Sequence, residues 1–159
     1  MKELFKTFLI ALAIFLLTPL TTDARSYVDD ETPIEIQIAA NKWGGEYNIC
    51  PELIIAICYQ ESKFDEKAVN PNGTCYGVMQ IQVKSHTDRM KMLGVTDLTD
   101  IDQCVHVGAD YLAELFERYE DTAIVLGMYH GESKAQEEIS AYTDAILTNS
   151  ERLERLHGK

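Results

Sequence analysis

The sequence predicts a compact, mainly α-helical domain with one small β element. Most of the chain carries apolar residues at helical spacing, and proline or capping residues stand where these segments begin. Only one short stretch, residues 77–82, alternates in a way that favours a strand. The chain has 159 residues and no internal repeat, so it is long enough for one domain with its own core.

The first two predicted helices begin at prolines. Residues 32–35 read Thr-Pro-Ile-Glu, a capping-box pattern, and predict a helix to about Trp43, where the glycine pair at 44–45 breaks it. Pro51 opens the second helix, which should end near Lys63. The second helix is apolar nearly all round, which predicts that it is the central, buried helix.

The remaining elements follow from turn residues and helical spacing. An Asn-Pro-Asn-Gly sequence predicts a turn at 70–73, ahead of the strand. A further turn is expected at 131–133. The helices predicted beyond the strand are 83–93, a long helix from the capping residues 97–102 to about Tyr119, a short one from 121–122 to Tyr129, and a last one from Ile139 to Leu156.

The N-terminus reads as a secretory signal peptide. Lys2 and Lys6 flank an apolar segment, and residues 22–24 fit cleavage after position 24. A membrane anchor is the alternative, but the apolar core is about half the roughly 20 residues that a span needs. We therefore expect a signal peptide at 1–24 and a secreted domain at 25–159, in the extracellular space, cell wall or periplasm and without a membrane segment.

The formal net charge of −12 limits the partners of the chain. An acidic protein is not attracted to nucleic acid or to anionic surfaces, so nucleic acid is not an expected partner. Capture of a substrate would then depend on a shaped cleft.

Four cysteines, Cys50, Cys58, Cys75 and Cys104, predict two disulfides behind a signal peptide. If residues 51–62 are helical, Cys50 and Cys58 lie about 12 Å apart along the helix axis. A disulfide needs Cα atoms within about 7 Å, so a Cys50–Cys58 bridge is excluded and Cys58 pairs with Cys75 or Cys104. The absence of a C-x-x-C pair and the scattered histidines argue against a metal site.

Glu61, at the end of the second helix, is the candidate general acid. The negative end of the helix dipole and the apolar helix beneath it both disfavour the ionised carboxylate, which raises the pKa. An acid that cleaves a glycosidic bond at neutral pH needs such a raised pKa. A glutamate at a helix end is more often a solvated surface residue. No second motif carboxylate is evident, and Asp65, Glu66 and Glu132 are candidates for one by proximity only.

The segments around Glu61 resemble the soluble lytic transglycosylase domain of the goose-type lysozyme-like superfamily, over about residues 34–147. Glu61 and Ser62 resemble its Glu-Ser pair, and Phe64 its following aromatic residue. Three more segments are similar to family motifs: the turn from Asn70 through Gly77-Val78-Met79-Gln80-Ile81, the helix with Cys104, Val105, Gly108, Tyr111 and Leu112, and the segment Gly127-Met128-Tyr129-His130-Gly131.

The resemblance implies a lysozyme-like fold in which the β element lines a sugar-binding cleft. Glu61 would be catalytic, and the substrate-binding residues would be Ser62, Asn70, Gly77, Met79, Gln80, Tyr129 and His130. Several positions depart from the family. His130 and Cys104 each replace an asparagine, and a Cys58–Cys104 disulfide would fit the second change. His86 and His106 are expected at the surface and Tyr111 in the core.

The implied activity is cleavage of the β-1,4 bond between MurNAc and GlcNAc in peptidoglycan glycan strands. In this family the glutamate acts first as acid and then as base, leaves a 1,6-anhydroMurNAc end and needs no cofactor or metal. The alternatives are a muramidase, which uses water, and a non-catalytic peptidoglycan-binding or assembly protein. Small members of the family accompany secretion, conjugation or phage machinery, so such an assembly is an expected partner.

Overall fold

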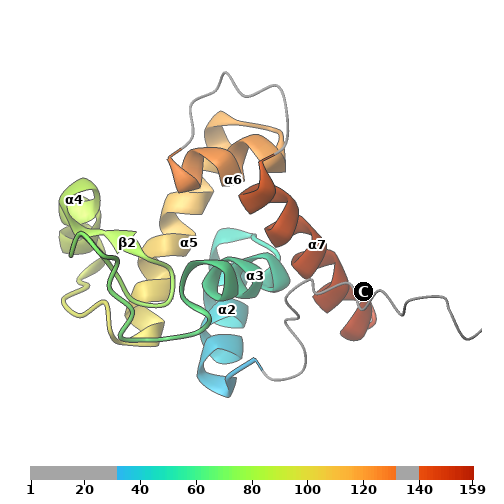
Figure 1. Cartoon of the computed structure of the whole chain (residues 1–159), viewed down its shortest axis with the longest axis horizontal. Coiled ribbons are helices and arrows are strands. Elements are labelled where there is room, and N and C mark those ends of the chain that lie inside the picture. Colours follow the sequence, from blue (N-terminus) through green and yellow to red (C-terminus); the bar gives the residue numbers. More distant parts are fainter. Residues whose placement is uncertain (1–31, 132–139) are drawn as a thin grey trace, which may run out of the picture.

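The computed structural model describes residues 32–131 and 140–159, which form a mainly helical domain (Figure 1). The elements are α2 (Ile34–Tyr47), α3 (Pro51–Ser62), β1 (Cys75–Tyr76), β2 (Ile81–Gln82), α4 (Val83–Leu93), α5 (Ile101–Arg118), α6 (Thr122–His130) and α7 (Ala141–Leu156). The predicted fold class is confirmed. The expected signal peptide, residues 132–133 of the expected turn and Ile139 lie outside the described residues.

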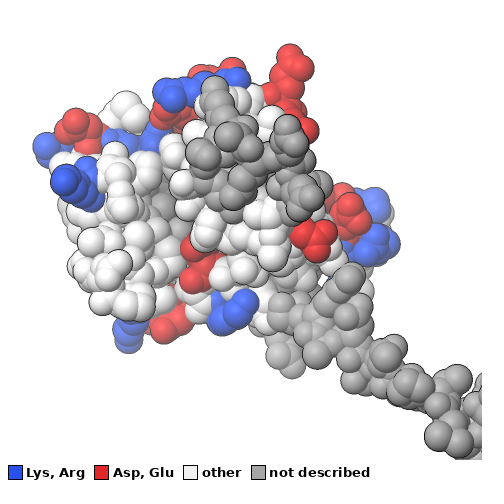
Figure 2. Space-filling view, turned by 45° about the horizontal axis from the view of Figure 1, so that its top comes forward, with Lys and Arg blue, Asp and Glu red and all other residues white. Residues whose placement is uncertain are grey.

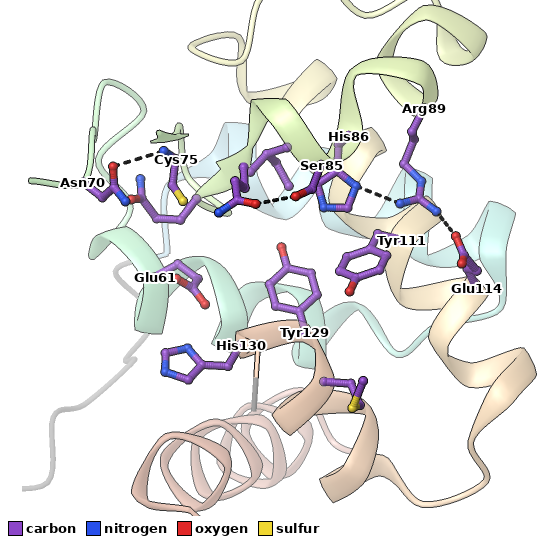
Figure 3. A pocket seen from close by; sticks show the side chains of 15 residues that line it. Glu61, Asn70, Cys75, Ser85, His86, Arg89, Tyr111, Glu114, Tyr129 and His130 are labelled. Atoms are coloured by element: carbon purple, nitrogen blue, oxygen red, sulfur yellow. Dashed lines mark hydrogen bonds and ion pairs between the residues drawn. The ribbon is translucent and has the colours of Figure 1, made fainter. Parts of the chain in front are cut away.

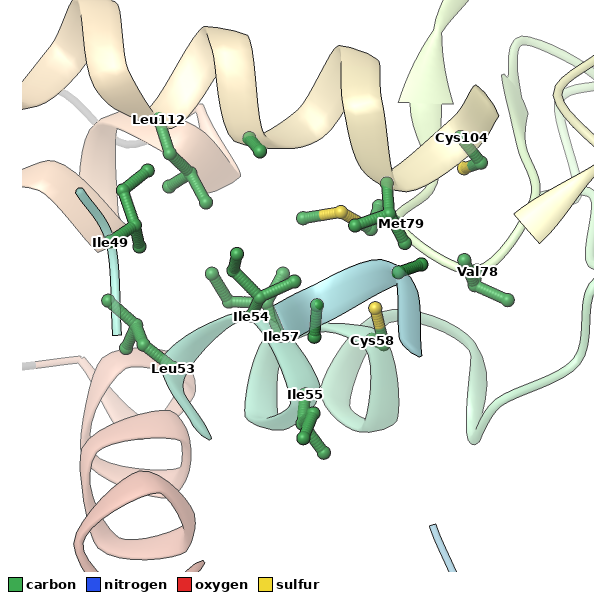
Figure 4. Packing of buried hydrophobic residues seen from close by; sticks show 14 of the residues in the cluster. Ile49, Leu53, Ile54, Ile55, Ile57, Cys58, Val78, Met79, Cys104 and Leu112 are labelled. Atoms are coloured by element: carbon green, nitrogen blue, oxygen red, sulfur yellow. The ribbon is translucent and has the colours of Figure 1, made fainter. Parts of the chain in front are cut away.

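Helix α3 is the centre of the fold, as its apolar sequence predicts. Every residue from Leu53 to Cys58 is buried, and α3 packs against α2 on one side and α7 on another. Figure 4 shows Ile54 and Ile57 of α3 facing Leu112 of α5 and Met79, which lies between β1 and β2. Because α3 is held on several sides, its C-terminal residue positions are fixed relative to the rest of the domain.

Helix α2 differs from the prediction at both ends. Its N-cap is Pro33 and no side chain caps it, so the predicted capping box does not form. The helix also continues through the glycine pair to Tyr47, and it ends at Asn48 in the left-handed conformation. Gly44 serves close packing instead: a Cβ there would lie 2.6 Å from the carbonyl oxygen of Ile49.

The β element is a short antiparallel hairpin, with Cys75 opposite Gln82. The predicted strand at 77–82 is therefore wrong over its first four residues, which form the connecting turn. Gly77 has φ +73°, and a Cβ there would lie 2.0 Å from the carbonyl oxygen of Leu98. Only glycine fits this turn, because the backbone is left-handed and a neighbouring segment touches it.

The later helices agree with the prediction, and their ends explain why. Gly94 ends α4 in the left-handed conformation, while the side chains of Asp100, Asp121 and Ser140 accept backbone hydrogen bonds at the starts of α5, α6 and α7. Such caps satisfy donors that the first turn of a helix leaves unpaired.

All four cysteines are free thiols, so the two predicted disulfides do not form in this structure. The predicted partners Cys58, on α3, and Cys104, in the first turn of α5, are both buried, but both are free thiols. The sulfur of Cys104 instead lies 3.8 Å from the carbonyl oxygen of Tyr76. Cys50 is at the other end of α3, where its thiol lies 2.9 Å from the carboxylate of Glu52.

No helix in the described ranges is long and apolar enough to cross a membrane. On the face shown in Figure 2, basic side chains lie mostly next to acidic ones, so the net negative charge is not gathered into one patch there.

Candidate active site

A cleft of about 700 Å³ opens between the hairpin and α4 on one side and α6 with the end of α3 on the other (Figure 3). It contains five of the eight sequence-predicted site residues. The cleft is lined by Glu61, Asn70, Cys75, Gln80, Ile81, Gln82, Ser85, His86, Arg89, Tyr111, Glu114, Met128, Tyr129, His130 and Gly131.

Glu61 lies in the last turn of α3 and faces this cleft, half-buried. Burial raises the pKa of its carboxyl group above the usual value, since desolvation disfavours the charged form. The hydroxyl of Tyr142, which donates to Glu61 Oε1, and the nearby His130 oppose this rise without cancelling it. The pKa of Glu61 is therefore shifted in the direction that a general acid needs.

Ser62, Gly77 and Met79 do not line the cleft but support it from behind. The Ser62 hydroxyl lies 3.0 Å from the carbonyl oxygens of Cys58 and Val78, which ties the end of α3 to the hairpin turn. Met79 is fully buried beneath that turn. Their positions suit residues that place Glu61 and Gln80 relative to each other.

Asn70 and Gln80 line the cleft and also hold its wall together. Asn70 Oδ1 accepts hydrogen bonds from the backbone N–H groups of Thr74 and Cys75, at 2.7 and 3.1 Å. Gln80 Nε2 donates to the carbonyl oxygens of Ala68 and Gly77, at 3.2 and 3.1 Å. Since the amide nitrogen of Gln80 is used in this way, its oxygen is the atom left for a ligand.

Tyr129 and His130 come from the end of α6, at the floor of the cleft in Figure 3. The Tyr129 hydroxyl donates to the carbonyl oxygen of Met79, at 3.0 Å. Burial, and then the charge of Glu61, raise the pKa of Tyr129 well above 10, so its phenol stays protonated. His130 is exposed and stacks on Tyr142, with ring centroids 3.9 Å apart.

Sequence reasoning missed Tyr142 and one end of the cleft. Tyr142 fits the apolar spacing of α7, and nothing local indicates that its hydroxyl reaches Glu61. His86 and Tyr111, expected at the surface and in the core, are both half-buried and line the cleft. The sequence signal available for this end of the cleft was the three-residue spacing of His86 and Arg89, because residues three apart lie on the same face of a helix.

Among the described residues, no three His, Cys, Asp or Glu side chains gather closely enough to hold a metal ion. The polar groups of the cleft are amides, hydroxyls, imidazoles, the thiol of Cys75, the guanidinium of Arg89, which is ion-paired with Glu114, and two carboxyl groups, Glu61 and Glu114. Such a lining suits an uncharged, hydroxyl-rich ligand, which is bound by hydrogen bonds to precisely placed polar groups.

A half-buried glutamic acid at the end of a central helix, facing a cleft walled by a β hairpin, defines a lysozyme-like domain. Comparison with known families agrees: residues 38–147 match the transglycosylase SLT domain, and the chain belongs to that family.

Similar curated proteins are much longer than this chain. The membrane-bound lytic murein transglycosylase F 1 of Alkalilimnicola ehrlichii is 40% identical over 73 residues, which are 46% of this chain and 14% of the relative. Membrane-bound lytic murein transglycosylase F of Enterobacter sp. is 34% identical over 103 residues, 63% of this chain and 18% of the relative. The chain thus spans less than a fifth of the length of either protein.

Two solved structures share the fold. An inactive mutant of the lytic transglycosylase Slt from Pseudomonas aeruginosa has a TM-score of 0.67 at 15% identity, over 80% of this chain and 25% of that one. The 70 kDa soluble lytic transglycosylase from Escherichia coli has a TM-score of 0.67 at 18% identity, with the same coverage.

Proposed function

We propose that this chain is a peptidoglycan lytic transglycosylase that cleaves the MurNAc–GlcNAc β-1,4 bond, with Glu61 as its single catalytic carboxyl group. Membership of the SLT family and the names of the similar proteins support the substrate and the reaction class. The observation that carries the assignment is Glu61 itself: a carboxyl group with a raised pKa, oriented by Tyr142 and open to the cleft.

In the proposed reaction the protonated Glu61 donates its proton to the glycosidic oxygen. The bond between this oxygen and C1 of MurNAc breaks, and positive charge develops on the ring. The resulting Glu61 carboxylate then accepts the proton of the C6 hydroxyl of the same sugar. The C6 oxygen attacks C1 and closes the 1,6-anhydro ring.

Attack by the C6 hydroxyl of the sugar itself fits a cleft in which the described residues supply no second carboxylate near Glu61. Hydrolytic glycosidases place two carboxyl groups about 5 to 9.5 Å apart. In the described cleft the other carboxylate is Glu114, which is ion-paired with Arg89 and with Arg118. Figure 3 shows Glu114 at the far end of the cleft from Glu61, so it is poorly placed to activate a water at the same bond.

The substrate implies an extracytoplasmic location, which the N-terminal sequence also favours. The predicted signal peptide at 1–24 would deliver the domain 25–159 to peptidoglycan. A secretion, conjugation or phage assembly as partner remains a prediction from the family resemblance.

The products test the proposal. Purified protein is incubated with peptidoglycan sacculi, and the released fragments are analysed by mass spectrometry with Glu61→Gln as the blank. Fragments one water lighter than reducing-end muropeptides are expected. Reducing ends would identify a muramidase, and no release by a folded protein that binds sacculi would identify a non-catalytic binding protein.

A further inference from the structure

The end of the cleft remote from Glu61 contains an ordered polar group that the proposed reaction does not use. Arg89 of α4 donates from Nε to Asp110, at 2.6 Å, and from Nη2 to Glu114, both on α5. Its side chain is only 13% exposed. The guanidinium charge is therefore balanced by carboxylates, and this part of the cleft does not attract anions.

The third hydrogen bond of Arg89 fixes the state of His86. Arg89 Nη1 lies 2.9 Å from His86 Nδ1. A guanidinium has only donors, so Nδ1 must accept, and the neutral ring must carry its proton on Nε2. The ring orientation is fixed as well, since His86 packs against Tyr111 with centroids 4.6 Å apart.

The Nε2–H group remains for a ligand. Within the described part of the chain, Nε2 makes no hydrogen bond, and Figure 3 shows the ring projecting from α4 into the cleft opposite Tyr111 and Tyr129. An imidazole whose tautomer is set by a charged neighbour is a pre-organised donor, which binds its acceptor without a cost in reorientation.

We propose that His86 is a substrate-binding residue, a neutral imidazole whose Nε2–H donates to an uncharged acceptor oxygen of the glycan, and that Arg89 is the positioning residue that fixes this tautomer. The acceptor is an acetamido carbonyl or a hydroxyl, the groups that N-acetylated sugars present. The inference rests on the proposed function for the identity of the ligand.

The same geometry makes binding sensitive to pH. The titratable and charged groups facing His86 are Arg89 on its own helix and Tyr111 and Glu114 on α5, with Tyr129 of α6 behind Tyr111. Burial, and then Arg89, lower the pKa of His86, against a weaker opposing effect of Glu114. His86 is therefore neutral at pH 7, and its protonation in acid would break the bond from Arg89.

The test measures binding without turnover. In a Glu61→Gln background, the Kd of a soluble tetrasaccharide of alternating GlcNAc and MurNAc is measured by calorimetry at about pH 7 and at a series of lower pH values. His86→Phe should weaken binding roughly tenfold at pH 7, the effect of one lost hydrogen bond. In the parent, binding should weaken further as the pH falls and His86 becomes protonated. His86→Gln keeps an N–H donor, so it should bind nearly as the parent does at about pH 7 but should not show this weakening in acid. His106→Phe is the matched control, because His106 stacks on Trp43 away from the cleft.

Nitrogen NMR of the unliganded protein provides a readout that does not depend on any ligand. The His86 ring should show the Nε2–H tautomer at pH 7, and Arg89→Met should give a tautomer mixture. An Nδ1–H ring, or His86→Phe binding as tightly as the parent, would overturn the inference. If the parent itself fails to bind the tetrasaccharide while the expected tautomer is seen, the proposed function fails and the assigned ligand fails with it.

Discussion

The hydroxyl of Tyr142 donates a hydrogen bond to Oε1 of Glu61, across 81 positions of sequence. The bond joins α7 to the end of α3, two helices that pack along each other. In the described residues the other carboxyl oxygen accepts no hydrogen bond, so it is the one available for proton transfer in the cleft.

Tyr142→Phe should lower kcat/KM about tenfold, because it removes one orienting hydrogen bond. It should also shift the alkaline limb of the pH–rate profile upward. Burial raises the pKa of Glu61 and the Tyr142 bond lowers it, so loss of this bond raises the pKa further. The acid then stays protonated to higher pH. Tyr59→Phe is the control. Tyr59 lies on α3, the helix of Glu61, but outside the cleft lining, so this change should leave the pH–rate profile unshifted. An unshifted limb in Tyr142→Phe would contradict the role given to this bond.

Glu61→Gln should lose at least about 100-fold in activity, the usual effect of a general acid. The amide keeps the shape of the side chain, so the thermal unfolding curve should be nearly unchanged. Glu66→Gln is the control, since Glu66 is an exposed glutamate in the loop that follows α3. Comparable rates for Glu61→Gln and the parent on purified peptidoglycan would exclude the single-carboxylate mechanism.

Tyr129→Phe should cost about tenfold in rate, far less than the loss of Glu61. The hydroxyl of Tyr129 holds the carbonyl oxygen of Met79, and its phenol cannot serve as a base because burial keeps its pKa well above 10. The ordering of the two variants is the measurement. If Tyr129→Phe is as damaging as Glu61→Gln, Tyr129 takes part in proton transfer.

The fold was predictable from the sequence where local chemistry decides it. Apolar spacing and capping residues located all six helices of the described ranges, because these signals act within one turn. The glycine pair in α2 led to a wrong prediction of the helix end, because its role there is set by tertiary packing and not by local chemistry. Glycine ends many helices, but Gly44 is there because the chain at Ile49 passes too close for a side chain, a tertiary fact that no local pattern contains.

The candidate site was predictable only in part. Motifs indicated Glu61, Gln80 and Tyr129, and the structure brings all three to one cleft. Tyr142 and His86 were missed because their roles depend on hydrogen bonds to Glu61 and Arg89 formed only in the packed domain. The disulfide prediction failed similarly, because a count of cysteines does not reveal how their thiols are placed in the packed domain.

Glu52 should make stability fall in strong acid. Its side chain is 2% exposed. Burial would raise its pKa, but hydrogen bonds from Cys50, Lys159 and His157 outweigh burial and lower the pKa from 4.5 to about 2. A depressed pKa contributes stability above the unfolded value, and this contribution is lost as pH falls from about 4.5 towards 2. It is about 3 kcal/mol at neutral pH, from about 1.4 kcal/mol per pKa unit.

Glu52→Gln should remove this contribution and flatten the acid limb of the stability curve, measured by urea unfolding between neutral and acid pH. Glu151→Gln is the matched control on α7, since Glu151 is 70% exposed in its ion pair with Arg155. If the free energy of unfolding falls equally in acid for the parent and for Glu52→Gln, the three hydrogen bonds to Glu52 make no net contribution to stability.

Adjacent glycines in α2 should respond oppositely to the same substitution. Both are helical, and alanine is favoured over glycine within a helix by about 1 kcal/mol. At Gly45 an added Cβ meets nothing within 4 Å, so Gly45→Ala should stabilise by roughly 0.5–1 kcal/mol. At Gly44 it would lie 2.6 Å from the carbonyl oxygen of Ile49, a backbone atom held by its neighbours. The contact can be relieved only by moving α2 away from the start of α3, so Gly44→Ala should destabilise by roughly 1–3 kcal/mol, as overpacking does. Unfolding free energies of the two single variants decide the matter: stabilisation by both would mean that the α2–α3 crossing yields easily and that the glycine pair serves no packing role.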